Sequence, residues 1–206
     1  MRYDSAGIEA IESRGPAWSA EEAWVVEGEP SLEIGAQDGA PEYIFFRVAG
    51  ALRLDDGRIV IADGFSNQVR FYSEAGEFLK AVGREGQGPG EYQYIRSLGR
   101  CAGDSVVAFD LHWQAKVYTA AGELVREMPL HDPNSYQGLG PYNLTCSRTG
   151  YFLITGWGER SFQQIIGFYQ AMAPVSLLDR DGNLVLDLGE HRASEQGGVE
   201  RGVPGS

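Results

Sequence analysis

The side chains best suited to binding or chemistry in this sequence are carboxylates, an amide, indoles and a guanidinium that lie in turn-rich stretches. Oxygen donors of this kind suit a metal ion or sugar hydroxyls, whereas indole rings offer flat apolar surfaces for stacking. These groups are the candidates for contact with a ligand. The six candidate ligand-binding residues are Asp63, Asn67, Asp110, Trp113, Trp157 and Arg160.

The two aspartates also have a structural interpretation. Asp63 and Asp110 are 47 residues apart and each ends a run of β-branched residues. A carboxylate repeated in this way typically caps the following loop by accepting its backbone N–H groups. We favour this capping role over a metal or sugar site.

Nucleophilic catalysis has no support in the sequence. The spacing of His112 and His131 from Cys101 and Cys146 does not make a Cys–His dyad, and a Gly-x-Ser-x-Gly motif is missing. We therefore predict no catalytic residue. The two cysteines fall in equivalent stretches of neighbouring repeats. Because adjacent inner strands usually diverge beyond disulfide reach, we predict two buried free thiols.

Two loops imitate known ligand-binding motifs. Gly83–Gly90 is glycine-rich like a phosphate cradle, but it lacks the Gly-Lys-Ser/Thr ending and Pro89 removes one N–H donor. We interpret it as a corner between repeats, in which Arg84 and Glu91 pair. Asp179–Asn183 begins like a calcium loop without the later ligands, so we predict a hairpin turn there and no metal site.

The elements that position these residues form a repeat. Residues 54–82 and 101–125 share a turn, a β-branched run ending in Asp, a polar loop, a run ending in an aromatic residue, and Ala-Gly-Glu. Gly76 and Gly122 occupy the same turn, and we predict positive φ at both. Gly182 follows Gly122 by 60 residues, so a third copy holds an insertion, placed at Ser161–Pro174.

The short runs in each copy, bounded by Gly, Asp or Asn, predict β-strands. A period of 46–47 residues that holds about four strands is the spacing of a propeller blade. The first blade is expected to have strands near Val48–Leu54, Arg58–Ala62, Gln68–Tyr72 and Glu77–Val82. Leu32–Gly35 is expected to be the outer strand of a preceding blade, giving about three and a quarter blades.

The run Val69–Gly83, followed by Arg84-Glu-Gly-Gln-Gly-Pro-Gly-Glu-Tyr92, resembles an NHL-type repeat of six-bladed, TolB-like β-propellers. It is similar in particular to secreted bacterial propellers of unassigned function, and Asp4–Ile8 resembles their lead-in segment. The resemblance implies an all-β fold of four-stranded antiparallel blades. It also implies an extracytoplasmic protein, although the sequence has no signal peptide, and it transfers no catalytic residue.

We expect a lead-in segment at residues 1–30, a partial β-propeller at 31–191 and a flexible tail at 192–206. The three blades are expected near residues 48–92, 96–142 and 143–191. In such blades the loops between strands two and three share a face with the loops between blades. This loop-rich face is expected to collect most aromatic residues, among them Phe65, Tyr92, Tyr94, Trp113 and Trp157. The insertion Ser161–Pro174 is either a flap over this face or a hairpin extension.

Charge excludes some partners. The formal net charge is −12 and the sequence pI is about 4.7, which argues against nucleic acid, including the RNA that some NHL propellers bind, and against anionic membranes. The longest apolar stretch is too short and too interrupted to span a membrane.

The sequence therefore predicts a non-catalytic binding module without a cofactor, whose partner is a small molecule, a glycan, a peptide or a protein. The alternative is a lactonase-like propeller hydrolase or lyase, with Ca²⁺ held by Asp63, Asn67 and Asp110. Apolar sheet faces left uncovered in a partial ring also predict self-association.

Overall fold

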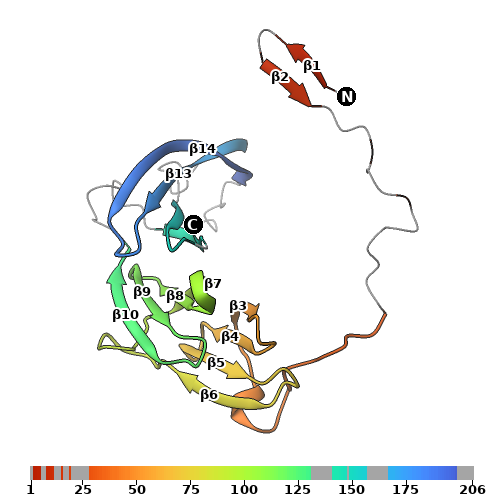
Figure 1. The fold of residues 1–206 in the computed structure, drawn as a ribbon, viewed down its shortest axis with the longest axis vertical. Coiled ribbons are helices and arrows are strands. Elements are labelled where there is room, and N and C mark those ends of the chain that lie inside the picture. Colours follow the sequence, from red (N-terminus) through yellow and green to blue (C-terminus); the bar gives the residue numbers. More distant parts are fainter. Residues whose placement is uncertain are drawn as a thin grey trace, which may run out of the picture. The chain divides into compact units, whose positions relative to one another are not determined.

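The computed structural model describes residues 2–5, 8–11, 15, 19, 28–130, 141–147, 149–156 and 167–198. The chain divides into two units, residues 1–33 and 34–206. The first unit contains an antiparallel hairpin of β1 (Arg2–Ser5) and β2 (Ile8–Ile11). The second unit contains the repeats (Figure 1).

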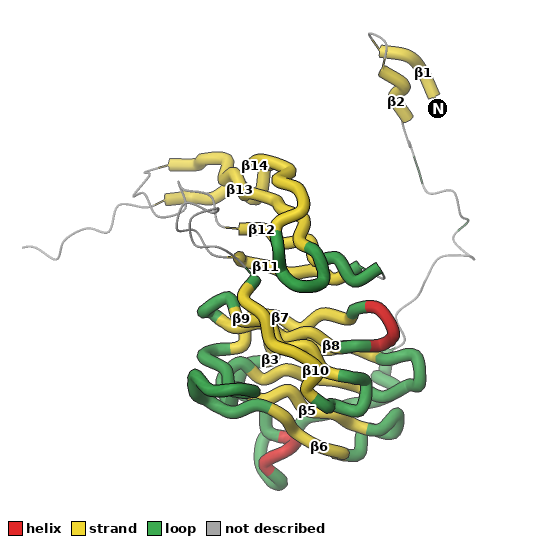
Figure 2. Tube along the Cα trace, turned by 60° about the vertical axis from the view of Figure 1, so that its left-hand side comes forward, coloured by secondary structure: helices red, strands yellow, loops and turns green. Residues whose placement is uncertain are grey.

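The described part of the second unit consists of three four-stranded antiparallel sheets, each with its strands in chain order (Figures 1 and 2). The first sheet contains β3 (Val48–Arg53), β4 (Ile59–Asp63), β5 (Gln68–Tyr72) and β6 (Phe78–Val82). The second contains β7 (Ile95–Arg100), β8 (Val106–Asp110), β9 (Gln114–Tyr118) and β10 (Leu124–Pro129). The third contains β11 (Pro141–Cys146), β12 (Phe152–Gly156), β13 (Gly167–Leu178) and β14 (Leu184–Gly198). Two short 3-10 helices, η1 (Pro41–Tyr43) and η2 (Ala102–Asp104), lie in loops.

The predicted fold class is confirmed, and the strands of the first blade begin and end within one residue of their predicted bounds. The predicted strand at Leu32–Gly35 is wrong. This segment has no ladder partner among the described residues, and a strand exists only where its N–H and C=O groups pair with a neighbour.

The two outer strands of the third blade, β13 and β14, are longer than predicted. β13 starts at Gly167, so the second half of the predicted insertion is strand and not loop. β14 pairs with it as far as Gly198, beyond residue 191, where we expected the propeller to end. Both strands extend because the backbone N–H and C=O groups of each extension find hydrogen-bond partners in the other. Residues 161–166 of the insertion lie outside the described residues.

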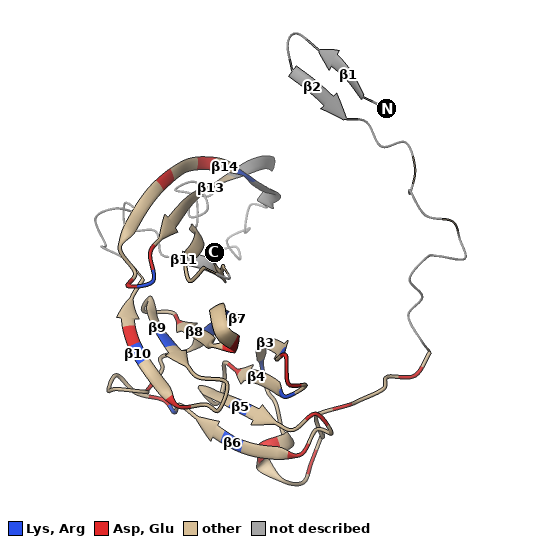
Figure 3. Ribbon diagram, viewed as in Figure 1, with Lys and Arg blue, Asp and Glu red and all other residues tan. Residues whose placement is uncertain are grey.

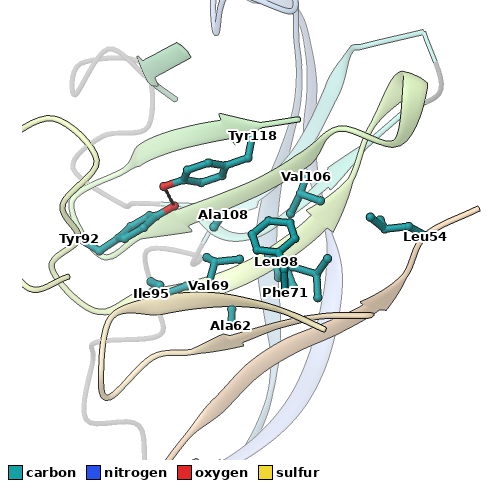
Figure 4. Close-up of a cluster of buried hydrophobic side chains, with 11 residues drawn as sticks. Leu54, Ala62, Val69, Phe71, Tyr92, Ile95, Leu98, Val106, Ala108 and Tyr118 are labelled. Atoms are coloured by element: carbon teal, nitrogen blue, oxygen red, sulfur yellow. Dashed lines mark hydrogen bonds between the residues drawn. The ribbon is translucent and has the colours of Figure 1, made fainter. Parts of the chain in front are cut away.

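The core lies between the sheets. One cluster of buried side chains joins the first and second sheets and includes Val60, Phe71, Ile95 and Tyr118 (Figure 4). A second cluster, which includes Phe109 and residues of β11, β12 and β13, joins the second and third sheets. Burying a large apolar side chain contributes about 1.5–3 kcal/mol, so packing between blades is the main stabilising term.

The inner strands pack side by side, with β7 contacting both β3 and β11. The turns between the third and fourth strands repeat in all three sheets. Gly76, Gly122 and Gly182 have φ of 84°, 75° and 86°. Each donates its N–H to the carbonyl three residues earlier. The predicted positive φ at Gly76 and Gly122 is therefore confirmed, because a tight turn at these places needs a left-handed residue.

Candidate functional site

Both repeated aspartates serve the backbone of their own blade. Asp63 Oδ1 accepts the N–H groups of Phe65, at 3.1 Å, and of Arg47, at 3.0 Å. Asp110 Oδ1 accepts the N–H of His112, at 2.9 Å, and its Oδ2 accepts that of Gln93, at 3.2 Å. Each carboxylate thus ties the loop after the second strand to the segment that enters the first strand. The capping interpretation is the one that the contacts support.

Asn67 and Trp113 occupy the position just before the third strand of their blades, both with positive φ, 56° and 63°. Asn67 is buried, and its Oδ1 accepts the N–H of Ile95 at 3.1 Å, which holds the first strand of the next blade. Trp113 is half-buried and packs against the second core cluster. Trp157 and Arg160 lie outside the described residues.

The loop-rich face carries an aromatic patch, which we define as Phe46, Arg47, Phe65 and Tyr94. Phe46 and Phe65 are 71% and 67% exposed, and their ring centroids are 5.1 Å apart with a 48° tilt. The Arg47 Cζ lies 4.1 Å from the centre of the Tyr94 ring. Leu111 borders the patch, because its N–H bonds the Tyr94 carbonyl and its side chain is exposed. Large exposed rings gathered on one surface are expected at an interaction site.

Sequence reasoning placed Phe65 and Tyr94 on this face but missed Phe46. The available signal was Ile44-Phe-Phe46, three consecutive large apolar residues that end two positions before the first strand. Tyr92, expected on the same face, is instead fully buried. Its hydroxyl contacts that of Tyr118 at 2.9 Å (Figure 4), and burial holds the pKa of Tyr92 well above its usual value.

Sequence reasoning also missed two buried cations at equivalent places on the third strands. The Arg70 guanidinium donates to the carbonyls of Pro41, Glu42 and Ile44, at 3.1, 3.1 and 2.8 Å. Lys116 is also buried, and its Nζ lies 4.5 Å from the centre of the Tyr92 ring. Buried cations need such partners, so both residues fasten the segment that enters their blade.

The glycine-rich corner is closed by its own carboxylate. Arg84 and Glu91 pair at 2.6 Å, as predicted. Glu91 Oε2 also accepts the N–H of Gly88 at 2.8 Å, and this bond, with the Arg84 guanidinium next, lowers the pKa of Glu91. A Cβ on Gly86 would collide with the Glu91 carboxylate. The Glu91 carboxylate therefore occupies the position in this loop that a bound phosphate would take.

The cysteine prediction is wrong. Cys101 and Cys146 form a disulfide with their Cα atoms 5.0 Å apart. The reason lies in the close packing of β7 and β11, whose ends come within disulfide reach. Two hollows of about 730 and 300 Å³ border this disulfide, and both cysteines line each of them.

The described residues contain no cluster of three or more potential metal-ligating side chains. Asp179–Asn183 forms the predicted hairpin turn, in which Asp179 Oδ1 accepts the N–H groups of Asp181 and Asn183 at 2.8 and 2.9 Å. The outer strands β10 and β14 carry residues of both charge signs and no basic stripe among their described residues (Figure 3). No described helix is long and apolar enough to cross a membrane.

Comparison with known proteins agrees with this architecture. A family model described as a six-bladed β-propeller matches residues 45–99. A solved structure from Bacteroides fragilis NCTC 9343, provisionally assigned as an exported protein, has a TM-score of 0.55 and 16% identity, over 78% of this chain and 42% of that chain. A protein of unknown function from Bacteroides caccae has a TM-score of 0.45 and 14% identity, over 68% and 48%.

The fold is thereby a β-propeller of the six-bladed type, represented in the described residues by three four-stranded blades. The chain spans less than half the length of these two structures. No curated protein matches the sequence.

Proposed function

We propose that this propeller is a non-catalytic binding module that captures a peptide segment of a partner protein on its loop-rich face. The observation that carries the proposal is the exposed ring pair of Phe46 and Phe65 beside the stacked pair of Arg47 and Tyr94. Aromatic and arginine side chains dominate the energetics of protein interfaces, and here the four lie together on one rigid scaffold.

The carboxylates of the same face support binding over hydrolysis. A calcium-dependent hydrolase needs several carboxylate oxygens that converge on one point. Asp63 and Asp110 instead direct their oxygens to the backbone N–H groups of two different blades. Asn67 directs its Oδ1 to the next blade's first strand.

The geometry of the patch favours a peptide over a glycan. A sugar ring stacks best on a flat, accessible ring, whereas Phe46 and Phe65 are tilted against one another and form a wedge. Such a wedge suits an aliphatic or aromatic side chain. The Arg47 guanidinium stacks on Tyr94, whereas its backbone N–H bonds Asp63, so the guanidinium is placed to pair with a carboxylate of the peptide.

We also propose that the protein works outside the cytoplasm. Disulfides persist mainly in oxidising compartments, and Cys101 and Cys146 form one. The assignment of the Bacteroides fragilis structure to export agrees with this.

The test is selection of peptides from a phage-displayed library, in parallel with a glycan array, against the intact protein. The F46S/F65S double variant is compared with L79S/L124S, which removes two exposed leucines from β6 and β10. Loss of a central aromatic pair costs at least about 2 kcal/mol, so we expect peptide affinity to fall at least about 30-fold in the patch variant alone. Equal loss in both variants, or binding of glycans without peptides, contradicts the proposal.

A further inference from the structure

In the second and third blades, the last residue of the first strand links the blade to the one before it. In the second blade this residue is Arg100, whose Nη2 lies 2.5 Å from Asp55 Oδ1 of the first blade. Its Nη1 also contacts the Arg53 carbonyl at 3.4 Å. In the third blade the equivalent residue is Cys146, bonded to Cys101 of the second blade. One position of the repeat therefore makes an ion pair at one junction and a disulfide at the next.

The two junctions differ in their other polar links. At the first junction, Asn67 Oδ1 accepts the Ile95 N–H, and Lys80 pairs with Glu123 at 2.7 Å. At the second junction the described residues give one ion pair, Arg126 with Asp181 at 3.1 Å. Both junctions have an apolar cluster. The disulfide adds a covalent link at the second junction.

Solvent reaches the disulfide from both of the hollows that it borders. Cys101 and Cys146 are half-buried, and each lines both hollows. Arg100 lines the larger hollow together with Asp55 and Asp104, with which it pairs, and Arg126 and Arg180 line the smaller one. A guanidinium such as that of Arg180 in the smaller hollow stabilises a departing thiolate, which favours exchange of a disulfide with an external thiol.

We propose that the Cys101–Cys146 disulfide is a reversible bridge that exchanges with dithiols in the folded protein, and that its opening loosens the third blade from the second. A thiolate of the dithiol attacks one sulfur, the S–S bond breaks, and the other cysteine leaves as a thiolate. The second thiol of the dithiol then attacks the mixed disulfide. Two electrons pass to the cystine, which becomes two thiols, and the dithiol leaves as a cyclic disulfide.

The experiment treats the native protein with dithiothreitol without denaturant and traps thiols with iodoacetamide, followed by peptide mass spectrometry. Hydrogen exchange of the oxidised and reduced proteins is measured over β4–β5 and β11–β12. We expect both cysteines to become alkylated, and exchange in β11–β12 to rise at least about tenfold while β4–β5 stays unchanged.

The C101S/C146S variant is the matched control, since it lacks the bridge at any redox state. Its hydrogen exchange over β11–β12 is expected to match that of the reduced protein and to stay the same when dithiothreitol is added. Thiols that appear only after denaturant is added overturn the proposal, and so does equal exchange of β11–β12 in the oxidised and reduced proteins. Should the variant fail to fold, trapping and exchange in the reduced native protein still decide the question.

Discussion

Replacing Gly122 by Ala tests the blade register at a turn that packs against the first blade. Gly122 has φ of 75°, so an alanine pays about 1–2 kcal/mol for a left-handed backbone. Its Cβ would lie 3.0 Å from Phe71 Cε2 and 3.0 Å from Lys80 Cδ. Lys80 is able to swing away, but Phe71 is 1% exposed and fixed in the core, which adds about 1–3 kcal/mol of overpacking.

Gly90 provides the matched control, because its φ is 73° and a Cβ there meets nothing within 4 Å. Gly90→Ala should therefore show the backbone cost alone. At about 2–4 °C per kcal/mol for a chain of this size, we expect Tm to fall by a few degrees for Gly90→Ala and by about 4–20 °C for Gly122→Ala. Calorimetry or thermal circular dichroism measures both. Equal shifts would refute the proposed contact with Phe71, and no shift in either would refute the turn assignment.

Asp110→Asn should lower the free energy of unfolding by about 1.5–3 kcal/mol, measured by urea titration, because an amide replaces a charged acceptor of backbone N–H groups; an unchanged midpoint would argue against capping. Burial raises the pKa of Tyr118 from 10.0 to about 12, so the folded state holds this proton longer. Stability is then complete below pH 10 and falls between pH 10 and about 12, and absorbance at 295 nm should show a tyrosine that titrates late in the folded protein only. Leu184, Leu186 and Leu188 of β14 are exposed, so we expect concentration-dependent association in sedimentation velocity that Leu186→Lys weakens; a monomer at every concentration would contradict this.

The sequence was most informative where a residue serves the backbone of its own blade. Asp63 recurs as Asp110, and Gly76 recurs as Gly122. The roles of these residues follow from loop capping and turn geometry, which act over a few residues. The Arg84–Glu91 pair belongs to the same local class. Local rules of this kind were enough to place the strands of the first blade and the loop-rich face.

Contacts between blades were harder to predict. The disulfide depends on how closely β7 approaches β11, and spacing along the chain does not report that distance. Arg70 and Lys116 look like solvated residues of a polar strand face until the segments that pack over them are known. Phe46 was missed for a related reason, since only its neighbours show that it has no place in the core.

Positions that differ between blades are therefore the better guide to function. A residue that recurs at the same place in two blades meets a need common to both, as Asp63 and Asp110 do. Where the second blade has Gln93, the first has the exposed ring of Phe46, and where the second blade has Arg100, the third has Cys146. The fold does not require either departure, because the equivalent blade closes without it. The aromatic patch and the disulfide are thus two places where this propeller departs from its own repeat, and the peptide selection and the reduction experiment examine them separately.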